Sequence, residues 1–132
     1  MSVGLLLITH NQIGAALLET SSHMLGMCPL MVEVLAVPAD CDPDAMVQRG
    51  REMVRGLDSG EGVLILTDMY GSTPSNIAAR LIDNQRVLAV SGVNLPMLVR
   101  VMNYPGLSAA DLAIKAESGG RDGIFYCIPG GE

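Results

Sequence analysis

The chain has 132 residues, of which 49% are hydrophobic and 3% aromatic, and its formal net charge is −6. A chain of this length is expected to form one domain, residues 1–132, with a core large enough to need no disulfide bonds. The acidic balance argues against nucleic acid as a partner, because phosphate binding requires a clustered positive surface. The shortage of aromatic residues also argues against a base-stacking surface.

The cysteines and the first residues of the chain indicate its compartment. Cys28, Cys41 and Cys127 are widely spaced and form no C-x-x-C pair, which is typical of reduced thiols in a cytosolic protein. No basic leader precedes the first apolar run, and no apolar run approaches the ~18 residues that a membrane span requires. We therefore expect a cytoplasmic protein.

Short apolar runs alternate with segments of helical periodicity, beginning at the N-terminus. Residues 3–8 form an apolar run that is too short for a helix and is typical of a strand covered on both faces in a parallel sheet. Asn11 is expected to cap a helix that reaches about residue 27. Residues 31–37 are expected to form the second strand.

The middle of the chain repeats this alternation. Asp42 is expected to cap a helix from residue 43 to near residue 60, because a proline and a second acid follow it in the first turn. The third strand is expected at residues 63–67. Thr73 and Pro74 are expected to start a helix that ends at about residue 83, and residues 86–91 to form the fourth strand.

The last third of the chain is expected to end in a strand. Asn94 is expected to cap a short helix over residues 96–103, and Ser108 a helix through residue 117. Gly119 and Gly120 then lead to an apolar strand at residues 124–128. The whole alternation predicts an α/β fold: an open, mainly parallel sheet of strand order 2-1-3-4 with right-handed crossovers and helices on both faces.

The residues of chemical interest follow the first and third strands. In a sheet of order 2-1-3-4 these strands flank the point where the strand order reverses, and ligands gather there beyond the carboxyl ends of the strands. His10 and Asp68 follow those two strands and would meet in this crevice. A carboxylate that binds one imidazole nitrogen leaves the other free as a nucleophile, and histidine can carry a transferred group.

The loop after Asp68 favours phosphoryl as that group. The hydroxyls of Ser72 and Thr73, together with the N–H groups of Ser75 and Asn76, would stabilise phosphoryl oxygens at a helix start. Each residue also has a simpler interpretation, in which the histidine is a loop residue, the aspartate caps a turn and Thr73 begins an ordinary helix.

Other chemistries lack their motifs. The sequence contains no phosphate-binding G-x-x-x-x-G-K-[ST] or G-x-G-x-x-G loop, no G-x-S-x-G elbow and no zinc-ligand spacing, so neither a cofactor nor a metal is expected. A response-regulator receiver domain also carries an aspartate after its third strand. Receivers share an acidic pair after the first strand and a lysine after a late strand. Here Thr9-His10 stands after the first strand instead, and the only lysine, Lys115, lies in an expected helix. These differences argue against a receiver domain.

Four stretches resemble the EIIA domain of the mannose-type (mannose, fructose and sorbose) sugar phosphotransferase system, and the similarity runs nearly from end to end. They are Ile8-Thr9-His10, the run from Thr67 to Asn76 that reads T-D-M-Y-G-S-T-P-S-N, the run from Ser91 to Leu98 that reads S-G-V-N-L-P-M-L, and the run from Gly119 to Gly123. The family often has glycine at the position of Asn11 and commonly has tryptophan at that of Tyr70.

The resemblance implies that His10 accepts a phosphoryl group from the phosphohistidine of the carrier HPr and passes it to an EIIB component. It also implies that Asp68 orients the imidazole and that Thr73 helps to hold the phosphoryl group. Met69, Tyr70, Asn94 and Pro96 are the expected rim for partner docking. The resemblance further implies a homodimer in which the two subunits exchange their last strands, here residues 124–128, and in which this strand is antiparallel to the others. It also implies that the protein meets the membrane only through a permease complex.

Three functions remain open at this point. The first is the phosphocarrier of a sugar phosphotransferase system, and because no EIIB domain follows residue 132, it would either serve a separate EIIB or report phosphorylation state in regulation. The second is the related phosphoryl-accepting subunit of a dihydroxyacetone kinase, which usually has D-M-G-S-A after the third strand, unlike the run that begins at Asp68 here. The third is a non-catalytic module that binds a protein partner.

Overall fold

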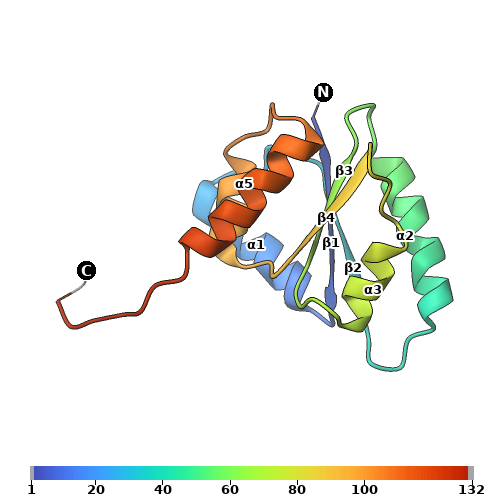
Figure 1. Cartoon of the computed structure of the whole chain (residues 1–132), viewed down its shortest axis with the longest axis horizontal. Coiled ribbons are helices and arrows are strands. Elements are labelled where there is room, and N and C mark those ends of the chain that lie inside the picture. The colour runs from blue at the N-terminus through green and yellow to red at the C-terminus, as the bar shows by residue number, and fades with distance from the viewer. Residues whose placement is uncertain (1, 131–132) are drawn as a thin grey trace.

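The computed structural model describes residues 2–130 and has three layers, with a sheet between two layers of helices (Figure 1). The middle layer contains four parallel strands: β1 (Gly4–His10), β2 (Val32–Val37), β3 (Val63–Thr67) and β4 (Val87–Ser91). Their spatial order is β2-β1-β3-β4, which confirms the predicted sheet. The strand order therefore reverses between β1 and β3.

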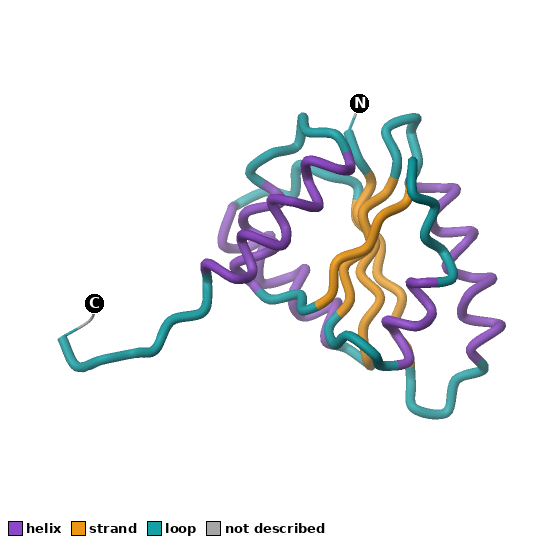
Figure 2. Tube along the Cα trace, in the orientation of Figure 1, coloured by secondary structure: helices purple, strands orange, loops and turns teal. Residues whose placement is uncertain are grey.

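The helices divide between the two faces of the sheet (Figures 1 and 2). One face is covered by α1 (Ile13–Leu25), α4 (Leu95–Met102) and α5 (Ala109–Asp122), and the other by α2 (Pro43–Leu57) and α3 (Thr73–Ala79). Parallel neighbours must be joined by crossovers that return over a face of the sheet, which accounts for this division.

Two cores form because side chains alternate between the faces of each strand. Leu5 and Leu7 of β1 pack with α4 and α5 in one cluster, whereas Leu6 and Ile8 pack with α2 and α3 in the other. All four are fully buried, as expected for a strand covered on both sides. The short apolar runs of the sequence therefore become the rigid frame that carries the strand ends.

Three of the four expected helix caps are present. The side chains of Asp42, Asn94 and Ser108 accept hydrogen bonds from backbone N–H groups in the first turns of α2, α4 and α5. Asn11 does not cap α1, because it has φ 45° and Gln12 occupies the cap position without a side-chain hydrogen bond. Instead, Oγ1 of Thr9 accepts from the backbone N–H of Gly14 at 2.7 Å.

The C-terminal part of the chain differs from the prediction. Gly119 and Gly120 do not end the last helix but lie inside α5, where they allow close contact with α4. An added Cβ at Gly119 would lie 2.7 Å from Cβ of Arg100, and one at Gly120 would lie 2.9 Å from Cε of Met97. The prediction that the helix ends before these glycines was wrong, because glycine also permits close packing between helices.

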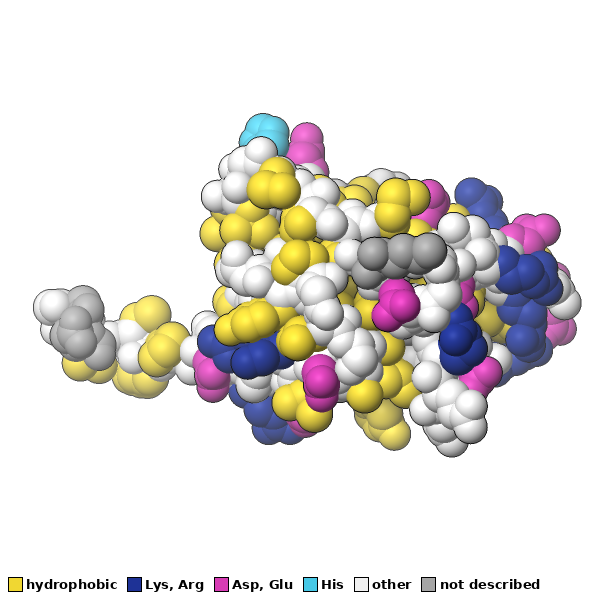
Figure 3. All heavy atoms as spheres, turned by 90° about the horizontal axis from the view of Figure 1, so that it is seen from above, with side chains coloured by type: hydrophobic (Ala, Val, Ile, Leu, Met, Phe, Trp, Pro, Cys, Tyr) yellow, Lys and Arg dark blue, Asp and Glu magenta, His cyan; other side chains and the backbone are white. Residues whose placement is uncertain are grey.

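Residues 124–128 form no strand within this chain. They follow α5 as an irregular segment that extends away from the three layers, and hydrophobic side chains line it (Figures 1 and 3). A strand requires a neighbour with which to exchange backbone hydrogen bonds, and α5 directs these residues away from β4. The expected antiparallel strand is therefore absent from the single chain.

A bidentate ion pair joins the turn before β3 to the start of β4. Nη2 of Arg86 lies 2.8 Å from Oδ1 and 2.9 Å from Oδ2 of Asp58, and the same carboxylate accepts from the N–H groups of Gly60 and Gly62. The hydrogen bond from Arg86, with help from the N–H of Gly60, lowers the pKa of Asp58 below its usual value. The ion pair therefore stabilises this end of the sheet when Asp58 is ionised.

We predict that Asp58→Asn lowers the free energy of unfolding at pH 7 and flattens its dependence on pH. A carboxyl group whose pKa is lower in the folded state stabilises the protein above its unfolded pKa of about 4, and this contribution is lost as the pH falls through the folded pKa. Urea denaturation between pH 7 and about pH 3 measures the effect. Glu33→Gln, at an exposed site without an ion pair among residues 2–130, is the control. Equal pH profiles for Asp58→Asn and the unmodified protein would contradict the prediction.

Candidate functional site

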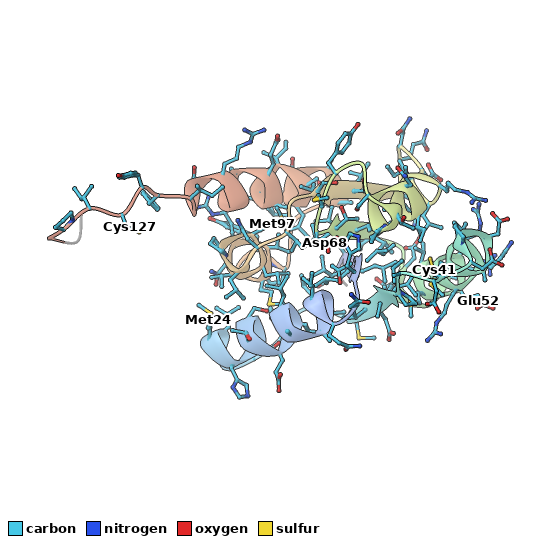
Figure 4. The ribbon with its side chains drawn as sticks, turned by 90° about the horizontal axis from the view of Figure 1, so that it is seen from below. Met24, Cys41, Glu52, Asp68, Met97 and Cys127 are labelled. Carbon is cyan, nitrogen blue, oxygen red and sulfur yellow. The ribbon has the colours of Figure 1, made fainter. Side chains whose placement is uncertain are left out.

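The site lies at the carboxyl ends of β1 and β3, where the strand order reverses. Ile8 pairs with Thr67 in the register of these strands, so β1 continues beyond the pairing while the chain leaves β3 at Asp68. Figure 4 looks onto these strand ends from below and shows Asp68 near the middle of this face, between the two helical layers. Parallel pairing of β1 and β3 therefore brings together two residues that are far apart in the sequence.

His10 and Asp68 are joined by two hydrogen bonds to one carboxylate oxygen. Oδ2 of Asp68 lies 2.9 Å from Nδ1 of the His10 ring and 3.0 Å from the backbone nitrogen of His10. Holding both the backbone and the ring by a single oxygen restricts the rotation of the imidazole. The sequence prediction that Asp68 pairs with His10 agrees with this geometry.

The two partners differ in their exposure. The His10 side chain is 39% exposed, whereas that of Asp68 is 10% exposed. Burial alone raises the pKa of Asp68, but the hydrogen bonds from the ring and the backbone N–H of His10 outweigh it, so that the pKa is lowered overall. Asp68 is therefore an ionised, largely buried anchor beneath an accessible ring.

Ionised Asp68 determines which ring nitrogen is free. A carboxylate only accepts hydrogen bonds, so the proton of a neutral His10 ring lies on Nδ1. Nε2 then carries an unshared electron pair, and no protein group among residues 2–130 forms a hydrogen bond with it. The arrangement has the requirements of a nucleophile: an accessible lone pair, a fixed ring and a carboxylate that stabilises the ring when it becomes cationic.

The loop after Asp68 carries the other predicted groups, and two of them are already engaged. The Ser72 hydroxyl donates to the carbonyl oxygen of Met69 at 2.5 Å, and the backbone N–H of Asn76 donates to the carbonyl oxygen of Ser72 at 2.9 Å. This hydroxyl and this N–H are therefore engaged within the protein, and their predicted role in binding a phosphoryl group stays a prediction. The hydroxyl shapes the turn, and the N–H makes the first hydrogen bond of α3.

Thr73 and Ser75 occupy the first turn of α3 with different exposures. Thr73 is exposed, and its hydroxyl has no hydrogen-bond partner among residues 2–130, whereas Ser75 is buried. Their N–H groups belong to the helix positions that lack an intrahelical acceptor, and Pro74 between them has no N–H. Oδ1 of Asp68 is also buried without a hydrogen-bond partner in the described part of the chain.

The predicted docking rim divides into two parts. Met69 and Tyr70 are 61% and 85% exposed, which leaves large apolar surfaces beside the site. The Asn94 amide instead binds α4 and α5 together, since Oδ1 accepts from the N–H of Met97 and Nδ2 donates to the carbonyl of Gly120. Pro96 is exposed at the contact between α4 and α5, directly beside Gly123.

Sequence reasoning missed how the turn after His10 is held. Asn11 lies in the left-handed region, which favours glycine and tolerates asparagine, and its N–H donates to the carbonyl of Val37 at 3.1 Å. This conformation accounts for glycine at the same position in the family that the sequence resembles. The glycine that the family often has at position 11 was the signal for a left-handed turn there. It was missed because an asparagine before a helix is equally typical of a helix cap.

Within residues 2–130, no three His, Cys, Asp or Glu side chains are grouped as metal ligands would be. The same part of the chain contains no helix with the length and apolar character to cross a bilayer.

We predict that His10→Ala raises the pKa of Asp68. The substitution removes the ring hydrogen bond and the ring charge, both of which lower this pKa, while burial continues to raise it. NMR titration of the Asp68 carboxyl carbon measures the change. His23→Ala, which removes the exposed histidine of α1, is the matched control and should leave Asp68 unchanged. An unaltered Asp68 titration in His10→Ala would show that the pair is not formed in solution.

Comparisons with known proteins identify the family. A family model described as "PTS system fructose IIA component" matches residues 4–116. The mannose-specific EIIAB component of Escherichia coli (strain K12) is 28% identical over 127 residues, which are 94% of this chain and 39% of that protein. The chain thus spans about two fifths of the length of that relative. The fructose-specific EIIA component of Bacillus subtilis (strain 168) is 26% identical over 102 residues, covering 76% of this chain and 69% of that protein.

Solved structures show the same fold. The mannose/sorbose-specific IIA subunit of the phosphotransferase system from Enterococcus faecalis has a TM-score of 0.85 at 19% identity and covers 97% of this chain and 96% of that chain. The PTS IIA protein associated with the fucose utilization operon of Streptococcus pneumoniae has a TM-score of 0.73 at 24% identity, covering 89% and 93%. This chain therefore belongs to the fructose and mannose family of EIIA components of the phosphotransferase system.

Proposed function

We propose that this protein carries a phosphoryl group as phosphohistidine on Nε2 of His10, accepting it from phosphorylated HPr and passing it to an EIIB component. The observation that carries the proposal is the pair of hydrogen bonds from His10 to Oδ2 of Asp68, which leaves Nε2 unprotonated and accessible. The family match and the relatives favour the sugar system over the dihydroxyacetone kinase subunit.

Transfer proceeds by in-line displacement at phosphorus. The Nε2 lone pair of His10 forms a new N–P bond while the N–P bond to the donor histidine breaks, and the donor ring nitrogen retains the electron pair. The Nδ1 proton stays on His10 and the ring becomes formally cationic, which the Asp68 carboxylate at 2.9 Å stabilises. Transfer to EIIB reverses these changes at His10, so no external cofactor or metal is needed.

The loop after Asp68 is the proposed holder of the phosphoryl oxygens. Phosphoryl transfer depends mainly on positioning and on stabilising the oxygens. The exposed Thr73 hydroxyl and the N–H groups of Thr73 and Ser75 are the donors without partners among residues 2–130. Ser72 and Asn76 support the proposal indirectly, since their hydrogen bonds maintain the loop and the start of α3.

The exposed surface beside the site suits carriers that must dock and leave. Met69 and Tyr70 offer apolar contact to HPr and then to EIIB, and Asn94 and Pro96 hold the neighbouring start of α4. We place this exchange in the cytoplasm, with the membrane reached only through the permease to which EIIB belongs. In the absence of such a permease, the same phosphorylation at His10 would report the state of the system to a regulator.

We propose that the protein is a homodimer in which each subunit supplies residues 124–128 as an antiparallel strand beside β4 of the other. Among the described strands β4 pairs only with β3. A bridge between Val87 and Asp83 occupies the start of its outer edge, and the rest of that edge is free. A hollow of about 530 Å³ runs along this edge, lined by Ala89 and Val90 of β4 and by residues of α3 and α5. Ile124, Phe125 and Tyr126 are each at least 75% exposed in the single chain. An apolar segment of strand length and a free apolar edge are complementary.

Incubation with phosphoenolpyruvate, enzyme I and HPr should add one phosphoryl group to His10, and His10→Ala should abolish it. Mass spectrometry locates the modification, and lability in acid with stability in alkali identifies the N–P bond. Asp68→Ala should remain labelled but at least about tenfold more slowly, because the ring loses its orientation and its charge partner.

His23→Ala is the control for this experiment and should be labelled at the unmodified rate. A protein that stays unlabelled would be a binding module rather than a carrier. An acid-stable modification would instead place the phosphoryl group on a hydroxyl, such as that of the exposed Thr73.

Removal of residues 124–132 should convert the dimer into a monomer, because the exchanged strands would be lost. Sedimentation velocity measures the change in mass, and removal of residues 130–132 alone is the control that keeps the strand. A monomeric full chain at high micromolar concentration, or a dimer that survives the longer truncation, would contradict the proposed exchange.

A further inference from the structure

We infer that Thr9 is a positioning residue for His10: its buried hydroxyl fixes the turn that aims the imidazole. The inference rests on the proposed phosphocarrier role of His10 and adds a residue to that site. Thr9 precedes His10 in β1 and is 0% exposed, whereas the His10 side chain is 39% exposed. A fully buried residue is thus directly followed in the chain by the residue with the accessible ring.

Among residues 2–130, the Thr9 hydroxyl has one hydrogen-bond partner, and this contact determines its role. Oγ1 accepts a hydrogen bond from the backbone N–H of Gly14 at 2.7 Å. This N–H lies in the first turn of α1, where backbone donors lack an intrahelical acceptor, and the residue at the cap position, Gln12, makes no side-chain cap hydrogen bond. Thr9 therefore caps α1 from the preceding strand.

The hydrogen bond from Gly14 to Thr9 closes a short loop of chain that contains His10. It joins the strand to the helix across His10, Asn11, Gln12 and Ile13, and it requires glycine at position 14. An added Cβ there would lie 2.8 Å from Oγ1 of Thr9 and 3.1 Å from Cγ1 of Val34. The close approach of helix and strand is thus built around this hydroxyl.

Three contacts to three different elements then hold the backbone around His10. Thr9 binds α1 through Gly14, His10 binds Asp68 after β3, and Asn11 donates to the carbonyl of Val37 at the end of β2. Asn11 adopts a left-handed conformation in this turn, which the surrounding contacts must maintain. Loss of the Thr9 contact would leave the helix side of the turn unsupported and let the ring move relative to Asp68.

Thr67 provides a matched comparison in the neighbouring strand. It directly precedes Asp68, is 1% exposed, and its hydroxyl lies 2.9 Å from that of Ser91 in β4. Its hydroxyl contact is also buried, but it joins two strands rather than the turn that carries His10. Thr67→Val therefore measures the general effect of losing a buried hydroxyl near the site.

The test compares Thr9→Val, Thr9→Ser and Thr67→Val in the full chain. The rate of labelling by phosphorylated HPr should fall about tenfold or more in Thr9→Val, since small displacements of a reacting group cost rate steeply. Thr9→Ser retains the acceptor oxygen and should recover a rate close to that of the unmodified protein, and Thr67→Val should also stay close to it.

Nitrogen-15 NMR of the imidazole provides a readout that does not depend on phosphorylation. In the unmodified protein and in Thr9→Ser, the His10 signals should report a proton on Nδ1 and a bare Nε2. In Thr9→Val they should report a mixture of the two tautomers, because the ring no longer keeps its alignment with Asp68. Thr9→Ala removes the same hydroxyl and replaces Thr9→Val in both measurements if the valine variant does not fold.

Two results would overturn the inference. One is a loss of rate in Thr9→Val that is no larger than in Thr67→Val, and the other is an imidazole spectrum that the loss of the Thr9 hydroxyl does not change. If the unmodified protein is not labelled at all, the proposed function fails, and the tautomer comparison then decides the role of Thr9 by itself.

Discussion

One carboxylate oxygen, Oδ2 of Asp68, accepts both hydrogen bonds that hold His10, and the chemistry of the site depends on it. The Asp68 side chain is largely buried, whereas the ring above it is accessible. Burial strengthens the interaction with the ring, and the hydrogen bonds offset the cost of burying the charge. The result is an ionised carboxylate that keeps one imidazole nitrogen protonated and the other free.

This contact exists because β1 and β3 are parallel neighbours in a rigid sheet. Their residues alternate between two cores, so each strand is packed on both faces and its end has little freedom to move. The loop after Asp68 is different, since Met69 and Tyr70 extend into solvent. The protein thus combines a fixed imidazole with an exposed apolar rim, the two features that the proposed transfer between two partners requires.

The fold also leaves one edge of the sheet incomplete. Beyond the bridge of Val87 to Asp83, β4 has a free outer edge beside a hollow, while the apolar residues 124–128 pair with no strand among residues 2–130. Both features expose surface that a single chain does not bury. The proposed exchange of the segment between two chains would cover both at once. It would place the dimer contact on the β4 side of the sheet, where Tyr70 also borders the hollow.

Local patterns in the sequence determined the elements of this protein. Apolar runs of strand length, caps such as Asp42 and prolines in first turns mark the elements and predict the alternation that gives the sheet order, because these signals arise from near neighbours in the chain. Tertiary structure alone decided the features that depend on distant neighbours. Asn11 is left-handed rather than a cap because Thr9 and Val37 hold the turn, and Gly119 lies inside a helix because Arg100 packs against it. The sequence could place His10 and Asp68 at two strand ends, but only the paired strands bring them within hydrogen-bonding distance.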